Sequence, residues 1–314
     1  MRILVNGWFC DEWATGSGQY LAALVATLPR ASDAHEWVLV RPAARGDESP
    51  LPPGWGSMRV RTPFDAASKD LAKLWFEQVA FPLACRRAGA DVAFVPYWGS
   101  ALWRPCPVVV TVHDLIPLLL PAYRGGVLQR GYTGLVARTA RLASAVLTDS
   151  EASRRDIIEH LRIPPERVHA VHLAIAACEP GVLAPESLAR VRGRYGLPDG
   201  AFLLYLGGFD VRKNVVRTLE GYAKVVEHHA GMGSRPPALV IAGRLPAADT
   251  PFAPDPRPAV KRLGLEEHVH IIGWVAEEDK RALYALATGA VFLSEYEGFG
   301  LPVLEAMACE AAAQ

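Results

Sequence analysis

The segment at residues 294–308 combines glycines, a proline and acidic side chains in a spacing suited to binding a phosphorylated ligand. Gly298 and Gly300 let the backbone bend and come close to a ligand. Pro302 suits the first position of a helix, where its missing N–H is not needed. The peptide N–H groups just before that helix would form a site for a diphosphate, because a helix N-terminus attracts anions. The residues that carry these groups are Phe299, Gly300 and Leu301.

Two glutamates flank this turn, Glu297 on the loop before the helix and Glu305 about one turn into it. A carboxylate can accept two hydrogen bonds from a vicinal diol, so the pair fits a sugar ring and a ribose on either side of the phosphates. The alternative is a strand, turn and helix with two solvated glutamates, since acidic residues usually lie exposed.

A histidine and an aspartate follow the continuous apolar run at residues 107–112, which is typical of a central parallel strand. Ligands of doubly wound sheets bind at the carboxyl ends of the strands, so His113 is a candidate for contact with a ligand. Asp114 would orient His113 or anchor the loop. A histidine at such a place can equally be structural.

A loop with two cations follows the apolar run at residues 202–206. It begins with Gly207 and Gly208 and carries Arg212 and Lys213, which offer a bidentate fork and a point charge for phosphate. Taken alone, these residues also fit a solvated loop.

A shorter glycine loop with Gly16 and Gly18 follows the first expected strand, residues 2–6. The apolar helix that comes next is expected to stop at Pro29. Many strand-to-helix turns contain glycine, so this loop by itself does not identify a function.

Further elements follow from apolar periodicity. Residues 69–88 predict one helix with Trp75 in the core and Gly89 as its cap. A second helix is expected to start near residue 149, with Ser153 and Asp156 at capping-box spacing. Other apolar runs predict strands at residues 37–40, 92–95, 145–148, 239–244, 269–272 and 290–293.

Composition excludes several classes. The 314 residues favour two domains, and a net charge of zero gives no electrostatic case for a nucleic-acid partner. Five scattered cysteines without a Cys-x-x-Cys pair predict reduced thiols in a cytoplasmic protein. The histidine pairs at 169/172 and 268/270 lack a third ligand nearby in the sequence, so no metal site is predicted.

Two apolar stretches bear on membranes. Residues 3–5 are too few for a secretory signal, and residues 115–120 are too few to span a bilayer. The expected location is therefore cytoplasmic, with a peripheral contact at the inner face of the membrane left open.

The string at residues 294–308 resembles the glutamate-seven-glutamate motif of family 4 retaining glycosyltransferases. The strings at residues 113–117 and 207–214 resemble further segments of that family, in the same order. The resemblance implies an α/β chain of the GT-B fold, with two Rossmann-like doubly wound domains facing a cleft. Residues 1–178 would form the acceptor-side domain and residues 179–314 the nucleotide-sugar donor domain.

The resemblance also implies an activity, the retaining and metal-independent transfer of a hexose from a nucleotide-diphosphate sugar. The acceptor would be a hydroxyl of a glycan or lipid-linked molecule in surface polysaccharide synthesis. The strings are most similar to those of bacterial mannosyltransferases, so the sugar would be mannose and the donor, in place of a cofactor, GDP-mannose.

Roles follow from the same resemblance. His113 would face the transferred sugar, and Glu297 and Glu305 would hold sugar and ribose hydroxyls. Lys213 and Arg212 would stabilise the leaving diphosphate. The glycine loops, Gly16 with Gly18 and Gly207 with Gly208, would lie near the phosphates. Many family members carry an arginine where Gly208 stands, so either Arg212 compensates from a shifted position or charge stabilisation is weaker here.

The sequence ends where members of the family continue, which implies a second domain without its final strand and helices. Two alternatives stay open. One is a truncated, inactive or weakly active sugar-nucleotide-binding protein, and the other is a sugar-nucleotide epimerase of the same architecture.

Overall fold

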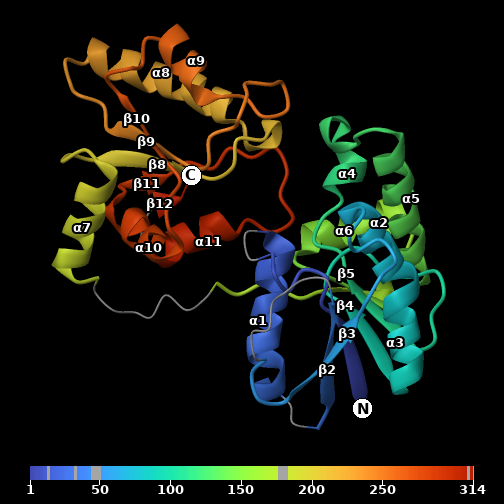
Figure 1. Cartoon of the computed structure of the whole chain (residues 1–314). Helices are drawn as coiled ribbons and strands as arrows, with labels where there is room; N and C mark the ends of the chain where they lie inside the picture. The colour runs from blue at the N-terminus through green and yellow to red at the C-terminus, as the bar shows by residue number, and fades with distance from the viewer. Residues whose placement is uncertain (13–14, 32–33, 44–50, 176–182, 310–311, 314) are drawn as a thin grey trace. The chain divides into compact units, whose positions relative to one another are not determined.

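The structure is a computed structural model that describes the chain except for residues 13–14, 32–33, 44–50, 176–182, 310–311 and 314 (Figure 1). The chain divides into two compact units, Met1–His172 (unit 1) and Leu173–Gln314 (unit 2). The domain boundary expected after residue 178 falls within residues 176–182, outside the described residues.

Unit 1 is built on a seven-stranded parallel sheet in the order β3-β2-β1-β4-β5-β6-β7. Its strands are β1 (Arg2–Asn6), β2 (Glu36–Pro42), β3 (Trp55–Val60), β4 (Val92–Val95), β5 (Val108–Thr111), β6 (Ala145–Thr148) and β7 (Val168–Ala170). Its helices are α1 (Gly16–Ala31), α2 (Lys69–Trp75), α3 (Phe81–Ala88), α4 (Ile116–Leu119), α5 (Val127–Leu142) and α6 (Glu151–Leu161). A π-helical turn η1 (Phe76–Ala80) and the 3-10 turns η2 (Pro121–Tyr123) and η3 (Pro165–Arg167) complete it.

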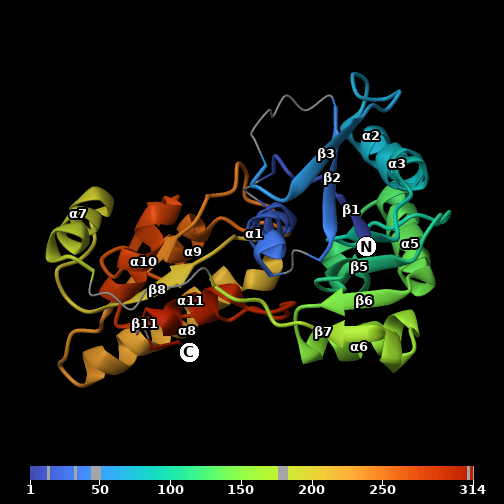
Figure 2. The ribbon, with the colours of Figure 1, turned by 90° about the horizontal axis from the view of Figure 1, so that it is seen from below.

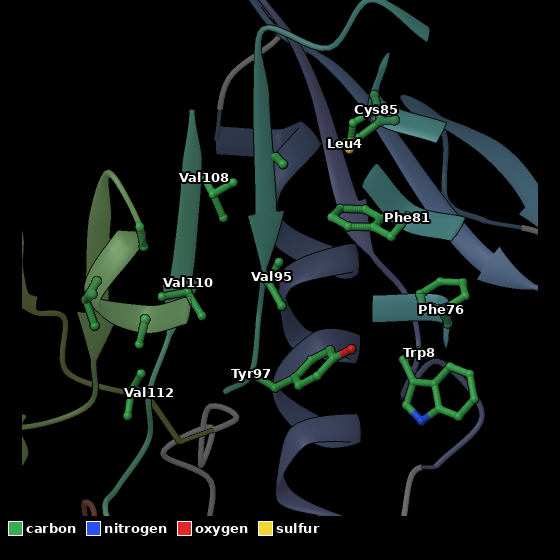
Figure 3. Packing of buried hydrophobic residues seen from close by; sticks show 14 of the residues in the cluster. Leu4, Trp8, Phe76, Phe81, Cys85, Val95, Tyr97, Val108, Val110 and Val112 are labelled. Atoms are coloured by element: carbon green, nitrogen blue, oxygen red, sulfur yellow. The ribbon is translucent and has the colours of Figure 1, made fainter. Parts of the chain in front are cut away.

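Both faces of this sheet are covered, as the near-continuous apolar strands predict. Ile3 and Val5 pack with Leu21 of α1 on one face, whereas Leu4 packs with Phe76 and Phe81 on the other (Figure 3). Figure 2 shows α1 on one side of the sheet and α2, α3 and α5 on the other. This is the doubly wound arrangement expected from the sequence.

The helix expected to stop at Pro29 instead runs through it to Ala31. Proline removes the N–H that would bond to the carbonyl four residues earlier. That carbonyl, of Val25, accepts a hydrogen bond from the Trp55 indole at 2.8 Å, so it keeps a partner. A contact from β3 thus compensates for the proline, and the local prediction was wrong.

The single helix expected at residues 69–88 is interrupted by η1. The Phe81 N–H donates to the Phe76 carbonyl, five residues back, directly before Pro82, which has no N–H to donate. The expectation for Trp75 was wrong: it is 38% exposed, as is Leu71 one turn earlier at 48%, while Ala72 and Phe76 form the buried face. Gly89 ends α3 in the left-handed region, as predicted.

The π-helical turn places a carboxylate, Glu77, inside unit 1 at 1% exposure. The Tyr132 hydroxyl lies 3.0 Å from each of its oxygens, and the Lys73 ammonium lies 3.6 Å from Oε1. Lys73 also lies over the rings of Phe9, Tyr97 and Tyr132, 4.9–5.6 Å from their centroids. Burial raises the pKa of Glu77 to about 7, although Lys73 and the two tyrosines act to lower it.

Unit 2 is built on a five-stranded parallel sheet in the order β10-β9-β8-β11-β12. Its strands are β8 (Phe202–Leu206), β9 (Ala238–Ala242), β10 (Val269–Gly273), β11 (Gly289–Ala290) and β12 (Ala312–Ala313). Its helices are α7 (Pro185–Tyr195), α8 (Val215–Gly231), α9 (Pro256–Arg262), α10 (Glu277–Leu286) and α11 (Leu301–Ala308), with a 3-10 turn η4 (Val211–Lys213). The expected lack of a final strand and helices stays an expectation.

The buried strand expected at residues 290–293 is shorter than predicted. Only Gly289–Ala290 forms β11, and Leu293 is 45% exposed. The chain leaves the sheet because the Leu293 carbonyl accepts a hydrogen bond from the Asn214 side chain at 2.9 Å. This departure directs residues 294–300 towards the loop after β8.

We expect Glu77→Gln to remove a pH-dependent loss of stability. The folded-state pKa of Glu77 is raised, so its contribution is fully present below the unfolded pKa and is lost as the pH rises towards 7. The free energy of unfolding of the variant minus that of the parent should therefore be ~2–3 kcal/mol larger at about pH 8 than at about pH 5.

Urea unfolding at the two pH values measures this difference. Glu151→Gln on α6, where the carboxylate side chain is 65% exposed, is the matched control and should show no such gain. A Glu77→Gln difference that stays constant or shrinks with rising pH would contradict the raised pKa.

Candidate functional site

A cluster of charged side chains lies beyond the carboxyl ends of β8 and β11 in unit 2. Glu297 Oε1 is 2.5 Å from the Lys213 ammonium and 2.6 Å from the Arg212 guanidinium. Arg212 also donates to the Tyr296 carbonyl at 2.9 Å. The structure therefore brings together three of the residues predicted to act on a phosphorylated sugar.

Backbone contacts join the two loops that carry this cluster. Asn214 adopts a left-handed conformation (φ 54°), ends η4 and holds the Leu293 carbonyl. The Glu295 N–H donates to the Arg212 carbonyl at 2.8 Å. The loop after β8 and the loop before α11 are thus fixed to each other independently of the ion pairs.

The charges of the cluster balance one another. Burial acts to raise the pKa of the Glu297 carboxyl, but the charge and hydrogen bond of Lys213, a hydrogen bond from Ser294 and the charge of Arg212 outweigh it. The pKa of Glu297 therefore lies below its ordinary value. Arg212 lies 3.4 Å from Asp210 as well, and Lys213 lies 5.0 Å from the centre of the Phe292 ring. An anion that binds these cations must share them with Glu297.

The turn before α11 has the predicted form. Gly300 is the N-cap of the helix at φ 98°, in the left-handed region that glycine tolerates, and Pro302 lies in the first turn. No side chain caps the helix, and its first backbone bond runs from the Val303 N–H to the Gly300 carbonyl at 3.0 Å. Phe299 and Leu301, which flank Gly300, lie partly buried at this turn.

Glu305 lies one turn into α11, as predicted, and Tyr284 orients it. The Tyr284 hydroxyl, 2% exposed as a residue, donates to Glu305 Oε2 at 3.3 Å. Burial, together with the charge of Glu305, raises the pKa of Tyr284, so it stays a donor. Nothing in the sequence marks Tyr284, because its apolar surroundings on α10 resemble an ordinary core.

The two glycines at the start of the loop after β8 are not required by close backbone contacts. A side chain at Gly207 would meet no atom within 4 Å, and one at Gly208 would meet Asp210 at 3.3 Å. The loop after β8 is approached closely by the backbone at Gly243, a role of this glycine that was not predicted from the sequence. A Cβ there would lie 2.0 Å from the Gly207 carbonyl, and its φ of 156° also favours glycine.

In unit 1, His113 follows β5, and both its side chain and its backbone carbonyl have hydrogen-bond partners. Its Nδ1 lies 2.7 Å from Asp149 Oδ2, and its carbonyl accepts from the Ser153 hydroxyl at 3.1 Å. Its Nε2 is buried with no hydrogen-bond partner in the described part of unit 1. The ring of Tyr20 meets the imidazole edge-on with centroids 4.8 Å apart. The imidazole is therefore oriented, and its second nitrogen is buried without a hydrogen-bond partner among the described residues.

Of the two roles expected for Asp114, the loop anchor is correct and the orienter is wrong. Asp114 Oδ1 accepts the Ile116 N–H at 2.9 Å, and Asp149 orients His113 instead. The signal for Asp149 was present in the sequence, because it directly follows β6. That strand pairs with β5, so their carboxyl ends meet at one edge.

The expected capping box of Ser153 and Asp156 is also wrong. Ser150 is the N-cap of α6, and its side chain accepts the Ser153 N–H at 3.0 Å. The Ser153 hydroxyl does not cap the helix and instead donates a hydrogen bond to the His113 carbonyl. The better cap lies three residues earlier, where the chain is still extended.

Gly16 and Gly18 belong to the first turn of α1. A Cβ at Gly18 would lie 2.1 Å from the Glu12 carbonyl, so glycine is required there, whereas Gly16 has open space. The Gly18 N–H donates to the Thr15 hydroxyl at 3.1 Å. Tyr20, further along α1, contacts the His113 ring, whereas the contacts of Gly18 are with Glu12 and Thr15.

Two features are absent from the described residues. No helix in the described ranges is long and apolar enough to cross a membrane. Among the same residues, no group of three or more histidines, cysteines, aspartates or glutamates could hold a metal ion.

Comparison with known proteins agrees with this architecture. Alr3699/HepE of Anabaena, solved in complex with UDP, is similar over the whole of this chain and 80% of its own, with 15% identity and a TM-score of 0.66. The described units thus have the α/β fold of the GT-B class. Residues 14–177 match the family model Glycosyltransferase Family 4, and residues 191–313 match Glycosyl transferases group 1. The first match covers more than half of the chain, which therefore belongs to glycosyltransferase family 4.

Two relatives from Escherichia coli are similar in sequence. O-antigen chain mannosyltransferase B is 30% identical over 64% of this chain and 50% of its own length. Serotype-specific mannosyltransferase WbdA is 32% identical over 66% of this chain and 25% of its own length. The chain thus spans about half of the first relative and a quarter of the second.

The ion pairs of Glu297 predict opposite effects of two substitutions on binding of a nucleoside diphosphate. Glu297→Gln should tighten binding roughly three- to tenfold, because the two cations lose their internal partner. Lys213→Ala should weaken it roughly tenfold or more, because a phosphate contact is lost.

Calorimetric titration with GDP and UDP measures both effects. Glu278→Gln, at an exposed position on α10, is the matched control and should leave the affinity unchanged. Equal losses of affinity in Glu297→Gln and Lys213→Ala would show that Glu297 does not compete with the anion.

Proposed function

We propose that this chain acts as a retaining, metal-independent hexosyltransferase that uses a nucleotide-diphosphate sugar. The observation that supports it most is the pairing of Lys213 and Arg212 with Glu297 in one cluster with the turn before α11. Negative charge builds on the diphosphate as the glycosidic bond breaks, and preorganised donors that receive it lower the barrier.

In the proposed reaction, the bond between the sugar C1 and the diphosphate oxygen breaks while the acceptor oxygen bonds to C1. The acceptor enters on the leaving-group side and its proton passes to a diphosphate oxygen, so the anomeric configuration is retained. Lys213 and Arg212 receive the charge together with the N–H groups of Phe299, Gly300 and Leu301. Glu297 turns from the cations to sugar hydroxyls, and Glu305, oriented by Tyr284, holds the ribose.

His113 would act on the transferred sugar. Asp149 fixes its ring, and Nε2, which is buried and has no partner among the described residues, would bond a sugar hydroxyl once a movement of its surroundings uncovers it. Gly16 and Gly18, in the same unit, would lie near the phosphates and the acceptor.

Mannose is the proposed sugar, with GDP-mannose as donor, because two relatives are mannosyltransferases. The acceptor would be a hydroxyl of a glycan or lipid-linked molecule in surface polysaccharide synthesis, reached at a membrane by peripheral contact. A UDP-sugar is the competing donor, since the similar Anabaena protein was solved with UDP.

A sugar-nucleotide-binding protein without turnover is the second candidate. Two features favour it: glycine at position 208, where many family members have arginine, and the occupation of both cations by Glu297.

Turnover with a panel of nucleotide sugars and a glycan acceptor mixture tests the proposal. GDP-mannose should release GDP only when acceptor is present, and the product should show the retained anomer by NMR. Lys213→Ala should lower kcat/KM by on the order of a hundredfold to a thousandfold, whereas Lys224→Ala, exposed on α8, should not.

Three results would contradict it. Binding without turnover would favour the sugar-nucleotide-binding protein, and an altered sugar nucleotide formed without acceptor would favour an epimerase. Turnover unchanged in Lys213→Ala would remove the cluster from the reaction.

We further expect Asp149→Asn to slow turnover roughly ten- to hundredfold without weakening nucleotide binding, because it acts on the orientation of His113 and not on unit 2. His113→Ala should behave alike, and His160→Ala, exposed on α6, should match the parent. Steady-state rates and calorimetric titration separate the two quantities. A loss of nucleotide affinity equal to the loss of rate would contradict the assignment.

A further inference from the structure

The turn that connects α4 to α5 exposes apolar side chains to an unusual degree. Val127 is 85% exposed and Leu128 is 91% exposed, the highest values among the large apolar residues described. They are the first two residues of α5, and Pro121 and Ala122 just before them are exposed as well. In Figure 1 this turn lies at the end of unit 1 away from the N-terminus. We call residues 121–130 the α5 tip.

The charged residues along this part of the chain have one sign. From residue 115 to residue 148 the sequence has no aspartate or glutamate and four arginines, although the whole chain is neutral. All four are exposed, and two of them, Arg124 and Arg130, bond to backbone carbonyls of the turn and of the helix before it. The Arg124 guanidinium donates to the Leu118 carbonyl at 3.5 Å, and that of Arg130 donates to the Gly125 carbonyl at 3.2 Å.

The helix itself adds to this positive end. Gly126 is the N-cap of α5 and has no side chain to bond the first N–H groups of the helix. Helix N-termini attract phosphate groups. Exposed aliphatic side chains, guanidinium groups and an N-terminus without a side-chain cap therefore meet within ten residues of chain.

We propose that the α5 tip docks this protein on an anionic lipid bilayer, with Val127 and Leu128 inserted at the headgroup boundary and Arg124 and Arg130 on lipid phosphates. Apolar residues flanked by basic ones bind such interfaces by area and charge together. A second copy of the chain is less suited, because a stable protein interface needs about 800 Å² on each partner, far more than two neighbouring side chains supply.

The position of the tip suits the proposed function, on which this paragraph alone rests. α4 starts three residues after His113 and is tied back to it through the Asp114 contact with the Ile116 N–H. Docking at the tip would hold the His113 end of the unit 1 sheet close to the bilayer. A lipid-linked acceptor would then be within reach of the site.

Flotation of the full chain with vesicles tests the proposal without any donor or turnover. Vesicles of phosphatidylcholine with phosphatidylglycerol should bind the protein, and vesicles of phosphatidylcholine alone should bind it roughly tenfold less. The double variant V127S/L128S and the double variant R124Q/R130Q should each lose roughly tenfold in partitioning. Raised salt should weaken the parent but have less effect on R124Q/R130Q.

Met232→Ser is the matched control, because Met232 is 63% exposed at the end of α8 in the other unit and should not affect partitioning. Thermal midpoints and GDP affinity equal to the parent's show that the variants are folded, and they report on the donor site separately. Absence of binding, equal binding to both vesicle types, or unchanged binding of V127S/L128S would overturn the proposal. So would a self-association of the parent that V127S/L128S abolishes, which would assign the tip to a second copy.

Discussion

The pairing of Glu297 with Lys213 and Arg212 is the interaction on which the site of unit 2 depends. It balances two partly buried cations that would otherwise repel each other, and it joins a loop that follows β8 to a loop that precedes α11. A close ion pair of this kind offsets its desolvation only when further hydrogen bonds satisfy its atoms. Here the Tyr296 carbonyl supplies one such bond. These contacts hold the cluster together by themselves, and under the proposed function a diphosphate would bind by exchange with the Glu297 carboxylate.

Parallel strands make this assembly possible. Because every strand pair in both sheets is parallel, the carboxyl ends of all strands in a unit meet at one edge. In unit 2 that edge gathers the loops after β8, β9 and β11, and Gly243 lets two of them approach closely. In unit 1 it places His113 after β5 next to Asp149 after β6. Each constellation comes from loops far apart in sequence and adjacent in the sheet.

Much of the fold could be predicted from the sequence, because parallel strands read as continuous apolar runs. The strands at residues 2–6, 92–95, 145–148 and 202–206 have the predicted bounds. Two of the misses involve a distant partner: Trp55 bonds the carbonyl left by Pro29, and Asn214 bonds the Leu293 carbonyl where the chain leaves the sheet. Two others are local, the π-helical turn that interrupts the helix expected at residues 69–88 and the cap at Ser150. Orienting partners such as Asp149 and Tyr284 required knowledge of which elements are neighbours, which no single segment contains.

The most direct test of the central claim is a crystal structure of the protein with a bound nucleoside diphosphate. The terminal phosphate should lie within hydrogen-bond distance of Lys213 Nζ, with the amides at Gly300 and Leu301 on the diphosphate and Glu305 on the ribose hydroxyls. Glu297 should have turned away from Lys213. A nucleotide bound elsewhere on the chain, or one bound here with both Glu297 ion pairs intact and no phosphate contact to Lys213, would contradict the central claim.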